Sequence, residues 1–152
     1  MDAPVFRAAR RADLESIVAL LADDAIGATR DDASLPLDDG YIRAFETLDN
    51  DPNQVMAVAE LDGAIIGCLQ LTFIPGLTRK GAWRGQIEGV RIAANLRGRG
   101  HGAAFFDWAI EHCRTRGCVL VQLTTDLRRD GAHRFYERLG FEATHTGMKL
   151  VL

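Results

Sequence analysis

Residues 90–102 read VRIAANLRGRGHG, which combines an apolar strand end, a short turn and a glycine-rich loop that opens into a helix near Gly100. The first N–H groups of a helix have no partner within it, and the helix dipole adds positive charge there, so anions bind at this position. Glycines also let a phosphate approach the main chain closely. The loop carries Arg97, Gly98, Arg99, Gly100 and Gly102. The stretch therefore predicts a phosphate site.

Two other interpretations of this loop are open. A glycine-rich loop can simply turn the chain. The spacing Gly98-x-Gly100-x-x-Ala103 also satisfies the relaxed dinucleotide-binding fingerprint, with Asp126 at the place of a ribose acid. Only about 50 residues follow the loop, too few for the further parallel units of a doubly wound sheet. The residues before the loop indicate antiparallel hairpins, so the nicotinamide interpretation is disfavoured.

Two motifs, in order and at the expected separation, resemble a known family. Residues 97–102, RGRGHG, look like the Arg/Gln-x-x-Gly-x-Gly/Ala signature of the GNAT family of N-acetyltransferases. Residues 132–141, AHRFYERLGF, are similar to the A-x-x-F-Y-x-x-x-G-F ending of that family, roughly 35 residues later. Arg129 departs from the pattern, because many relatives carry asparagine there, and its role is left open.

The resemblance implies an α/β fold with a mixed sheet, in which antiparallel N-terminal strands precede a βαβ crossover and the fourth and fifth strands splay apart. Local patterns predict the elements. Asp13 and Asp130 are expected to cap the first and last helices, and Asp62-Gly63 to form a tight hairpin turn. The expected strands are 5–9, 54–61, 64–73, 83–92 and 118–124, with one or two more in 141–152, and the central helix is 100–116.

Composition predicts one globular domain over residues 1–152, because 47% of the chain is hydrophobic and 26% is charged. Apolar runs such as 64–69 are far shorter than the roughly 20 residues of a membrane helix, so we expect a cytoplasmic protein with no membrane partner. Cys68, Cys113 and Cys118 lack C-x-x-C spacing. They are interpreted as small buried hydrophobic residues, and neither a disulfide nor a metal site is expected.

Charge is unevenly distributed along the chain. Residues 23–51 hold nine acidic side chains against Arg30 and Arg43, a net charge of −7, and the rest of the chain carries +4. The family resemblance places this segment on the acceptor side, where it would concentrate positive partners. We therefore expect an acceptor that is a cationic small-molecule or peptide amine. Nucleic acid is not an expected partner, because nucleic-acid binders are usually basic overall.

The resemblance also implies the site residues. Acetyl-CoA would lie in the gap between the splayed strands, with its pyrophosphate on the 97–102 loop and its amide-bearing arm paired with the backbone of the fourth strand. The expected cofactor-binding residues are Val90, Arg91, Ile92, Arg97, Gly98, Arg99, Gly100, His101 and Gly102. Core packing is the alternative role for Val90 and Ile92.

Two residues are candidates for proton transfer. Tyr136 matches a family position whose phenol commonly protonates the departing thiolate, although a core tyrosine is the alternative. Glu88 lies two residues before Val90, so strand alternation puts it on the same face as Val90 and Ile92 unless a bulge intervenes. We expect Glu88 to be the base, directly or through water, unless it is only solvated or paired with an arginine.

The sequence thus predicts an acetyl-CoA-dependent N-acetyltransferase that acts on a primary amine by direct attack on the thioester. The rival hypothesis is a regulatory or interaction domain that binds CoA without turnover. A homodimer is a further expectation, from the resemblance and the β-rich residues near the C-terminus.

Overall fold

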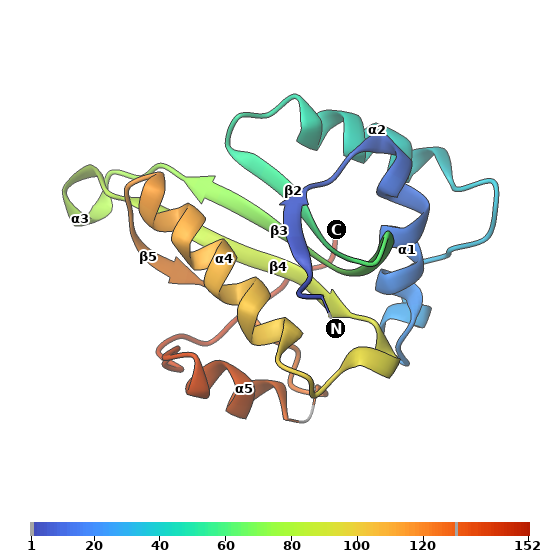
Figure 1. Cartoon of the computed structure of the whole chain (residues 1–152). Helices are drawn as coiled ribbons and strands as arrows, with labels where there is room; N and C mark the ends of the chain where they lie inside the picture. Colours follow the sequence, from blue (N-terminus) through green and yellow to red (C-terminus); the bar gives the residue numbers. More distant parts are fainter. Residues whose placement is uncertain (1, 130) are drawn as a thin grey trace.

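A five-stranded sheet in the order β1-β2-β3-β4-β5 forms the centre of the molecule (Figure 1). The computed structural model describes residues 2–129 and 131–152. The strands are β1 (Val5–Ala8), β2 (Gln54–Leu61), β3 (Ala64–Ile74), β4 (Trp83–Ile92) and β5 (Cys118–Gln122). Strands β1 to β4 pair antiparallel, whereas β4 and β5 are parallel. This confirms the predicted mixed sheet, and its order lacks the reversal of a doubly wound dinucleotide fold.

Helices cover both faces of the sheet (Figure 1). On one face, α1 (Leu14–Ala22) and α2 (Asp39–Asp49) pack with Val58 and Cys68. On the other, α4 (His101–Thr115) packs with Leu69, Leu71 and Ile87, and α5 (Ala132–Arg138) lies beside α4. The shorter elements are α3 (Thr78–Gly81) and the 3₁₀ turns η1 (Arg11–Asp13), η2 (Gly27–Thr29) and η3 (Ala94–Leu96).

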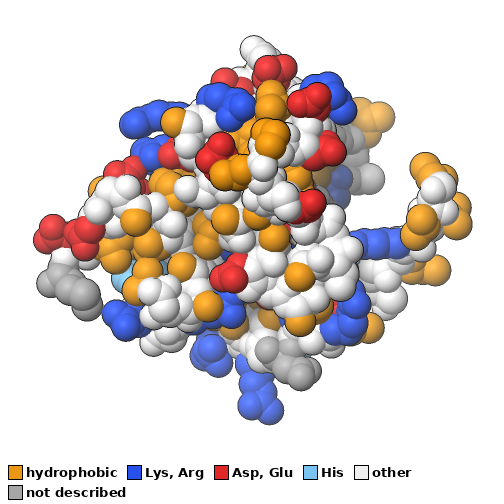
Figure 2. Space-filling model, turned by 90° about the vertical axis from the view of Figure 1, so that its right-hand side faces the viewer, with side chains coloured by type: hydrophobic (Ala, Val, Ile, Leu, Met, Phe, Trp, Pro, Cys, Tyr) orange, Lys and Arg blue, Asp and Glu red, His pale blue; other side chains and the backbone are white. Residues whose placement is uncertain are grey.

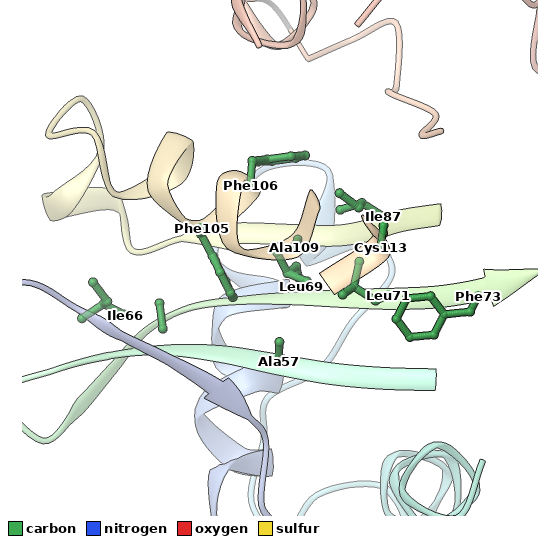
Figure 3. Packing of buried hydrophobic residues seen from close by; sticks show 11 residues of the cluster. Ala57, Ile66, Leu69, Leu71, Phe73, Ile87, Phe105, Phe106, Ala109 and Cys113 are labelled. Atoms are coloured by element: carbon green, nitrogen blue, oxygen red, sulfur yellow. The ribbon is translucent and has the colours of Figure 1, made fainter. Parts of the chain in front are cut away.

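The α4 face holds the larger core (Figure 3). Phe105, Phe106, Ala109 and Cys113 recur at helical spacing and are almost fully buried, which fixes the face that α4 turns to the sheet. Gly85 of β4 lies directly below Cys113: a Cβ atom there would come within 2.4 Å of the Cys113 sulfur. This close approach holds α4 against β4. It therefore also fixes the position of the loop that leads into the helix.

Local turn chemistry is confirmed at the first hairpin. Asp62 and Gly63 take φ values of 51° and 81° between β2 and β3, the left-handed pair that a two-residue turn needs. The cysteine interpretation is confirmed for Cys68 and Cys113, which are 0% and 1% exposed free thiols, whereas the free thiol Cys118 is only partly buried. Burial raises the pKa of the Cys68 thiol to about 12, so this sulfur stays protonated.

Two predictions about the elements are wrong. Asp13 does not cap α1 with its side chain, because that carboxylate instead accepts hydrogen bonds from the Arg10 N–H and from the Arg7 guanidinium at 2.7 and 2.8 Å. Residues 141–152 form no strand, because no described strand runs alongside to pair with them. The capping role expected of Asp130 lies outside the described residues. Within the described ranges, no helix has the length and apolar character to cross a membrane.

Candidate active site

A gap opens between β4 and β5 halfway along β4. The last pair between these strands is Gln86 with Gln122, yet β4 continues to Ile92 (Figure 1). In the open half, the carbonyl of Val90 accepts a hydrogen bond from the Arg91 side chain at 2.8 Å, and that of Ile92 accepts one from Arg97 at 3.1 Å. These main-chain groups are paired with side chains instead of a strand, which confirms the predicted splay.

A pocket of about 930 Å³ fills this gap. Its walls come from the open end of β4, the glycine loop, the first turn of α4, the helix α5 and residues 24–26 after α1. Phe106, which is fully buried, contributes the apolar floor. The pocket therefore connects an apolar channel beside β4 with a loop of open backbone, and it has room for a long ligand with one anionic end.

The glycine loop is shaped for an anion. Gly98 and Gly100 have φ values of 76° and 85°, which side-chain-bearing residues rarely adopt, and the space where their Cβ atoms would stand is open. Gly100 precedes α4, whose first N–H groups have no helical partner. Arg97 lines the same pocket. These features fit a pyrophosphate, as the sequence predicts.

Seven of the nine expected cofactor-binding residues line this pocket: Val90, Arg91, Ile92, Arg97, Gly98, Gly100 and Gly102. Arg99 is exposed and His101 is half-buried, and neither forms part of the wall. Both remain predictions as cofactor ligands.

Tyr136 projects from α5 into the pocket wall, where its ring lies 5.5 Å from that of Phe106. Burial raises the pKa of the Tyr136 phenol, although the charges of Arg129 and Arg91 partly oppose this effect. A phenol with a raised pKa is fully protonated at neutral pH. Tyr136 can therefore donate a proton inside the pocket.

Glu88 lies on the other side of β4 from the one expected. The pairing of β3 with β4 shifts between Cys68 and Gln70, and Gly89 takes a φ of 62°, so β4 bulges directly after Glu88. The extra residue reverses the alternation. Glu88 therefore shares the α1 and α2 face with its neighbour Gln86, is exposed, and does not line the pocket.

Comparison with known proteins identifies the fold family. The model of the acetyltransferase (GNAT) family matches residues 14–141. The chain belongs to the GNAT family. An aminoalkylphosphonate N-acetyltransferase from Salmonella typhimurium is 33% identical over 95 residues, covering 62% of this chain and 61% of that protein. A glucosamine 6-phosphate N-acetyltransferase from Trypanosoma brucei brucei is 37% identical over 90 residues, or 59% of each chain.

This GNAT chain thus aligns with about three fifths of the length of those two relatives. Among solved structures, one described as a transcriptional regulator from Bacillus halodurans C-125 is 46% identical, with a TM-score of 0.96. That alignment covers 98% of this chain and 99% of the other.

Three charged residues, Asp24, Arg91 and Arg129, meet at the wall of this GNAT pocket. Arg129, at the family's asparagine position, forms an ion pair with Asp24. Burial would raise the pKa of Asp24, but hydrogen bonds from the Gly27 N–H and Arg129 outweigh it and lower the pKa. Burial and the charge of Arg129 lower the pKa of Arg91. The buried Arg91 Nε has no partner among the described residues.

No local signal in the sequence could have assembled this group. Asp24 follows the first helix, Arg91 lies in β4 and Arg129 precedes α5, so folding alone brings them together. Arg128 and Arg138 also reach the wall. The side chains of the described residues that line the pocket thus carry several positive charges against one carboxylate, that of Asp24. Among the described residues, no group of histidine, cysteine and carboxylate side chains could hold a metal ion.

Proposed function

We propose that this protein is an N-acetyltransferase that moves an acetyl group from acetyl-CoA to a primary amine of a small molecule or peptide by direct attack on the thioester. Family membership supports the reaction class. The observation that supports it most is one pocket that joins the glycine loop, the unpaired end of β4 and Tyr136. A CoA-shaped ligand needs these three parts in that order.

Each part of the pocket has a proposed task. When bound, acetyl-CoA supplies an activated acetyl group. The N–H groups around Gly98 and Gly100, with Arg97 and with Arg99 and His101 nearby, bind the phosphates. The backbone from Val90 to Ile92 binds the amide-bearing arm as a neighbouring strand would. Tyr136 donates its proton to the leaving sulfur, and Glu88 accepts a proton from the amine on the opposite face of β4, directly or through water.

The energetics show which proton transfer most needs a catalytic group. An alkylamine with a pKa near ~10.4 is almost entirely protonated at pH 7, so freeing its lone pair costs about 4.6 kcal/mol. A leaving thiol with a pKa around ~8.5 needs less assistance. Glu88 lies two residues beyond Gln86, the last residue of β4 that pairs with β5, and its exposed carboxylate can receive a proton and pass it to water.

Glu88→Gln is expected to lower kcat at pH 7 by about 10- to 50-fold, below the usual range for a general base because water reaches this exposed position. The loss of kcat should become smaller as the pH approaches the pKa of the acceptor amine, since a deprotonated amine needs no base. Glu111→Gln, on the exposed side of α4, is the control and should match the parent. A deficit that stays constant from pH 7 to pH 10 would remove Glu88 from the proton path.

The walls of the pocket favour an amine that also bears an anionic group, such as a phosphate, phosphonate or carboxylate. Arg91 is half-buried there with a spare donor, whereas Asp24 is already paired with Arg129. The other acids of residues 23–51 lie outside the wall, so the lining does not favour the cationic acceptor that we expected. Two relatives are named for phosphonate- and phosphate-bearing amines.

An acceptor panel read by thiol release tests this proposal. Glucosamine 6-phosphate and 2-aminoethylphosphonate should have higher kcat/KM than glucosamine, spermidine or a lysine peptide. Arg91→Gln should raise KM for the two anionic amines by about 10- to 100-fold, as loss of a hydrogen bond to a charged group predicts, and leave glucosamine unaffected. Arg114→Gln, on the exposed face of α4, is the matched control. A preference for spermidine that high salt abolishes would instead support the cationic acceptor.

The rival function is a CoA-binding regulatory or interaction domain without turnover. It is favoured by the description of the Bacillus halodurans structure as a transcriptional regulator. The panel separates the two: binding of CoA by calorimetry with no thiol release for any amine would support the rival.

A further inference from the structure

Two arginines and one carboxylate meet in the pocket wall, and their charges do not balance. Arg91, Arg129 and Asp24 all line the pocket, and each comes from a different part of the chain. Arg129 forms its ion pair with Asp24, whereas the buried Arg91 Nε has no partner among the described residues. These three side chains therefore carry one excess positive charge and an unused donor, which a further anion could satisfy.

The two arginines lie close enough to influence each other and the proposed acid. Burial and then the charge of Arg129 lower the pKa of Arg91. Burial raises the pKa of Tyr136, and the charges of Arg129 and Arg91 oppose that shift. An anion held between the two guanidinium groups would thus lie near the end of the pocket where Tyr136 acts.

The carboxylate of Asp24 is shared between two partners. Its Oδ1 accepts a hydrogen bond from the Gly27 N–H, and its Oδ2 faces the Arg129 guanidinium. Gly27 is fixed in the turn after α1, because a Cβ atom there would collide with the carbonyl oxygen of Leu21. Asp24 is therefore held by its own segment, and its contact with Arg129 is the one that a ligand can replace.

A second ion pair joins the same two segments outside the pocket wall. Arg30 pairs with Asp126 at 2.9 Å, and Asp126 also pairs with Arg128 at 2.8 Å. Neither Arg30 nor Asp126 lines the pocket. The connection between the residues after α1 and those before α5 can therefore persist when Arg129 leaves Asp24.

The wider surface also favours an anion at this end of the molecule. On the face shown in Figure 2, acidic side chains lie mainly in the upper part, and Lys and Arg are the main charged side chains in the lower part. Figure 1 draws α5 and the glycine loop at that lower level. Positive surface charge of this kind raises the local concentration of anions. Within the described part of the pocket wall, Asp24 alone carries the opposite charge.

We infer that the Asp24 carboxylate occupies the place of the acceptor's anionic group, and that a phosphate, phosphonate or carboxylate of the acceptor displaces it from Arg129. The incoming anion then lies between Arg129 and Arg91 and uses the Nε donor of Arg91. Asp24 thereby makes the site selective. A free anion gains little by replacing a carboxylate that is already in place, whereas an acceptor also brings the contacts of its amine and carbon skeleton.

This inference rests on the proposed function for the identity of the acceptor, but the anion site itself does not require acetyl transfer. Ethylphosphonate is therefore the probe, because it has the anionic group and no amine. Its binding to the CoA-saturated protein can be measured by calorimetry without turnover.

Asp24→Asn tests the displacement, because asparagine changes only the half of the side chain that meets Arg129. Its Oδ1 can still accept from the Gly27 N–H, while its NH₂ group replaces the oxygen that faced Arg129. With Arg129 released and a repelling charge removed, ethylphosphonate should bind about 10- to 100-fold more tightly, as one added hydrogen bond between charged groups predicts. Loss of the fold cannot produce a gain in affinity.

Asp23→Asn is the matched control, since Asp23 is the exposed neighbour of Asp24 outside the pocket wall and carries the same charge. It should bind ethylphosphonate as the parent does. Arg129→Gln should weaken binding by about 10-fold. Combined with Asp24→Asn, it should remove most of the gain, because the two side chains act through one contact. In turnover, Asp24→Asn should raise the ratio of KM for glucosamine to KM for glucosamine 6-phosphate.

The inference would be overturned if ethylphosphonate bound to none of these proteins, or if Asp23→Asn and Asp24→Asn gave equal gains. A full gain in the absence of Arg129 would also overturn it. So would weaker binding in Asp24→Asn, which would make Asp24 a residue that orients Arg129. If no amine releases thiol but Asp24→Asn still tightens ethylphosphonate binding, the anion site is supported and only the proposed function fails.

Discussion

Gly100→Glu is expected to weaken acetyl-CoA binding by about 100-fold or more, which is at least about 2.7 kcal/mol. The substitution places a negative charge where the free N–H groups of α4 would otherwise meet a pyrophosphate. Because nothing lies within 4 Å of a Cβ atom at this position, the new side chain would extend into the open pocket and would not collide with the protein. Calorimetry with acetyl-CoA on the folded variant measures the effect.

Backbone strain needs its own control, because Gly100 has a φ of 85° that glutamate adopts at a cost. Gly63→Glu meets this need. Gly63 has a φ of 81°, open space around its missing Cβ atom, and a place in the β2–β3 hairpin outside the pocket wall. The Gly63→Glu variant should have similar backbone strain and should bind acetyl-CoA with the affinity of the parent. Equal affinity losses in the two variants, or none in Gly100→Glu, would move the phosphate site elsewhere.

The parts of the fold that the sequence predicted are those with local signals. Asp62-Gly63 sets the hairpin through its own backbone preferences, and the alternation of the flanking residues fixes both strands. The glycine loop before α4 likewise depends on residues adjacent in the chain. Two such motifs at the right separation were enough to indicate the family and the splayed sheet.

The parts that the sequence missed depend on a single inserted residue or on distant partners. One bulge at Gly89 was enough to move Glu88 to the opposite face, and alternation cannot reveal where a strand will bulge. The contact of Asp24 with Arg129 joins residues more than one hundred positions apart. The pattern of residues 148–152 is that of a strand, but a strand forms only where a neighbouring edge exists.

The bulge at Gly89 also divides β4 into two parts whose side chains face different ways. Before it, Ile87 faces the α4 core, while Glu88 faces the side covered by α1 and α2. After it, Val90 and Ile92 return to the α4 face, and Arg91 lies on the same side as Glu88. In the reaction that we propose, one strand would therefore present backbone to the cofactor and two charged side chains to the acceptor.

Tyr136→Phe is expected to lower kcat by about 100-fold with little change in KM for acetyl-CoA, because the phenol proton is needed only as the sulfur leaves. General acids contribute typically 10²- to 10⁴-fold, and the low end applies here because a thiolate leaves fairly readily unaided. The phenylalanine ring preserves the contact with Phe106 at 5.5 Å, so thermal stability should barely change.

The pH dependence of the ratio of parent to variant kcat tests whether Tyr136 is the acid. Burial raises the pKa of the Tyr136 phenol above its ordinary value of about 10, so the parent keeps its acid from pH 7 to pH 9. The ratio of parent to variant kcat should be constant over that range and should fall only at higher pH, where the phenol ionises. A ratio that falls through pH 7 to 9 would mean that the titrating acid is another group.

The other tyrosine of the chain, Tyr41, supplies the matched control for Tyr136→Phe. Tyr41 also loses only a hydroxyl when replaced by phenylalanine, but its phenol donates to Asp31 at 2.9 Å on the α2 side, away from the pocket wall. Tyr41→Phe should keep parental kcat under conditions where chemistry limits the rate. If Tyr136→Phe also kept it, Tyr136 would be reduced to a residue of the core beside Phe106, and the CoA-binding domain without turnover would gain support.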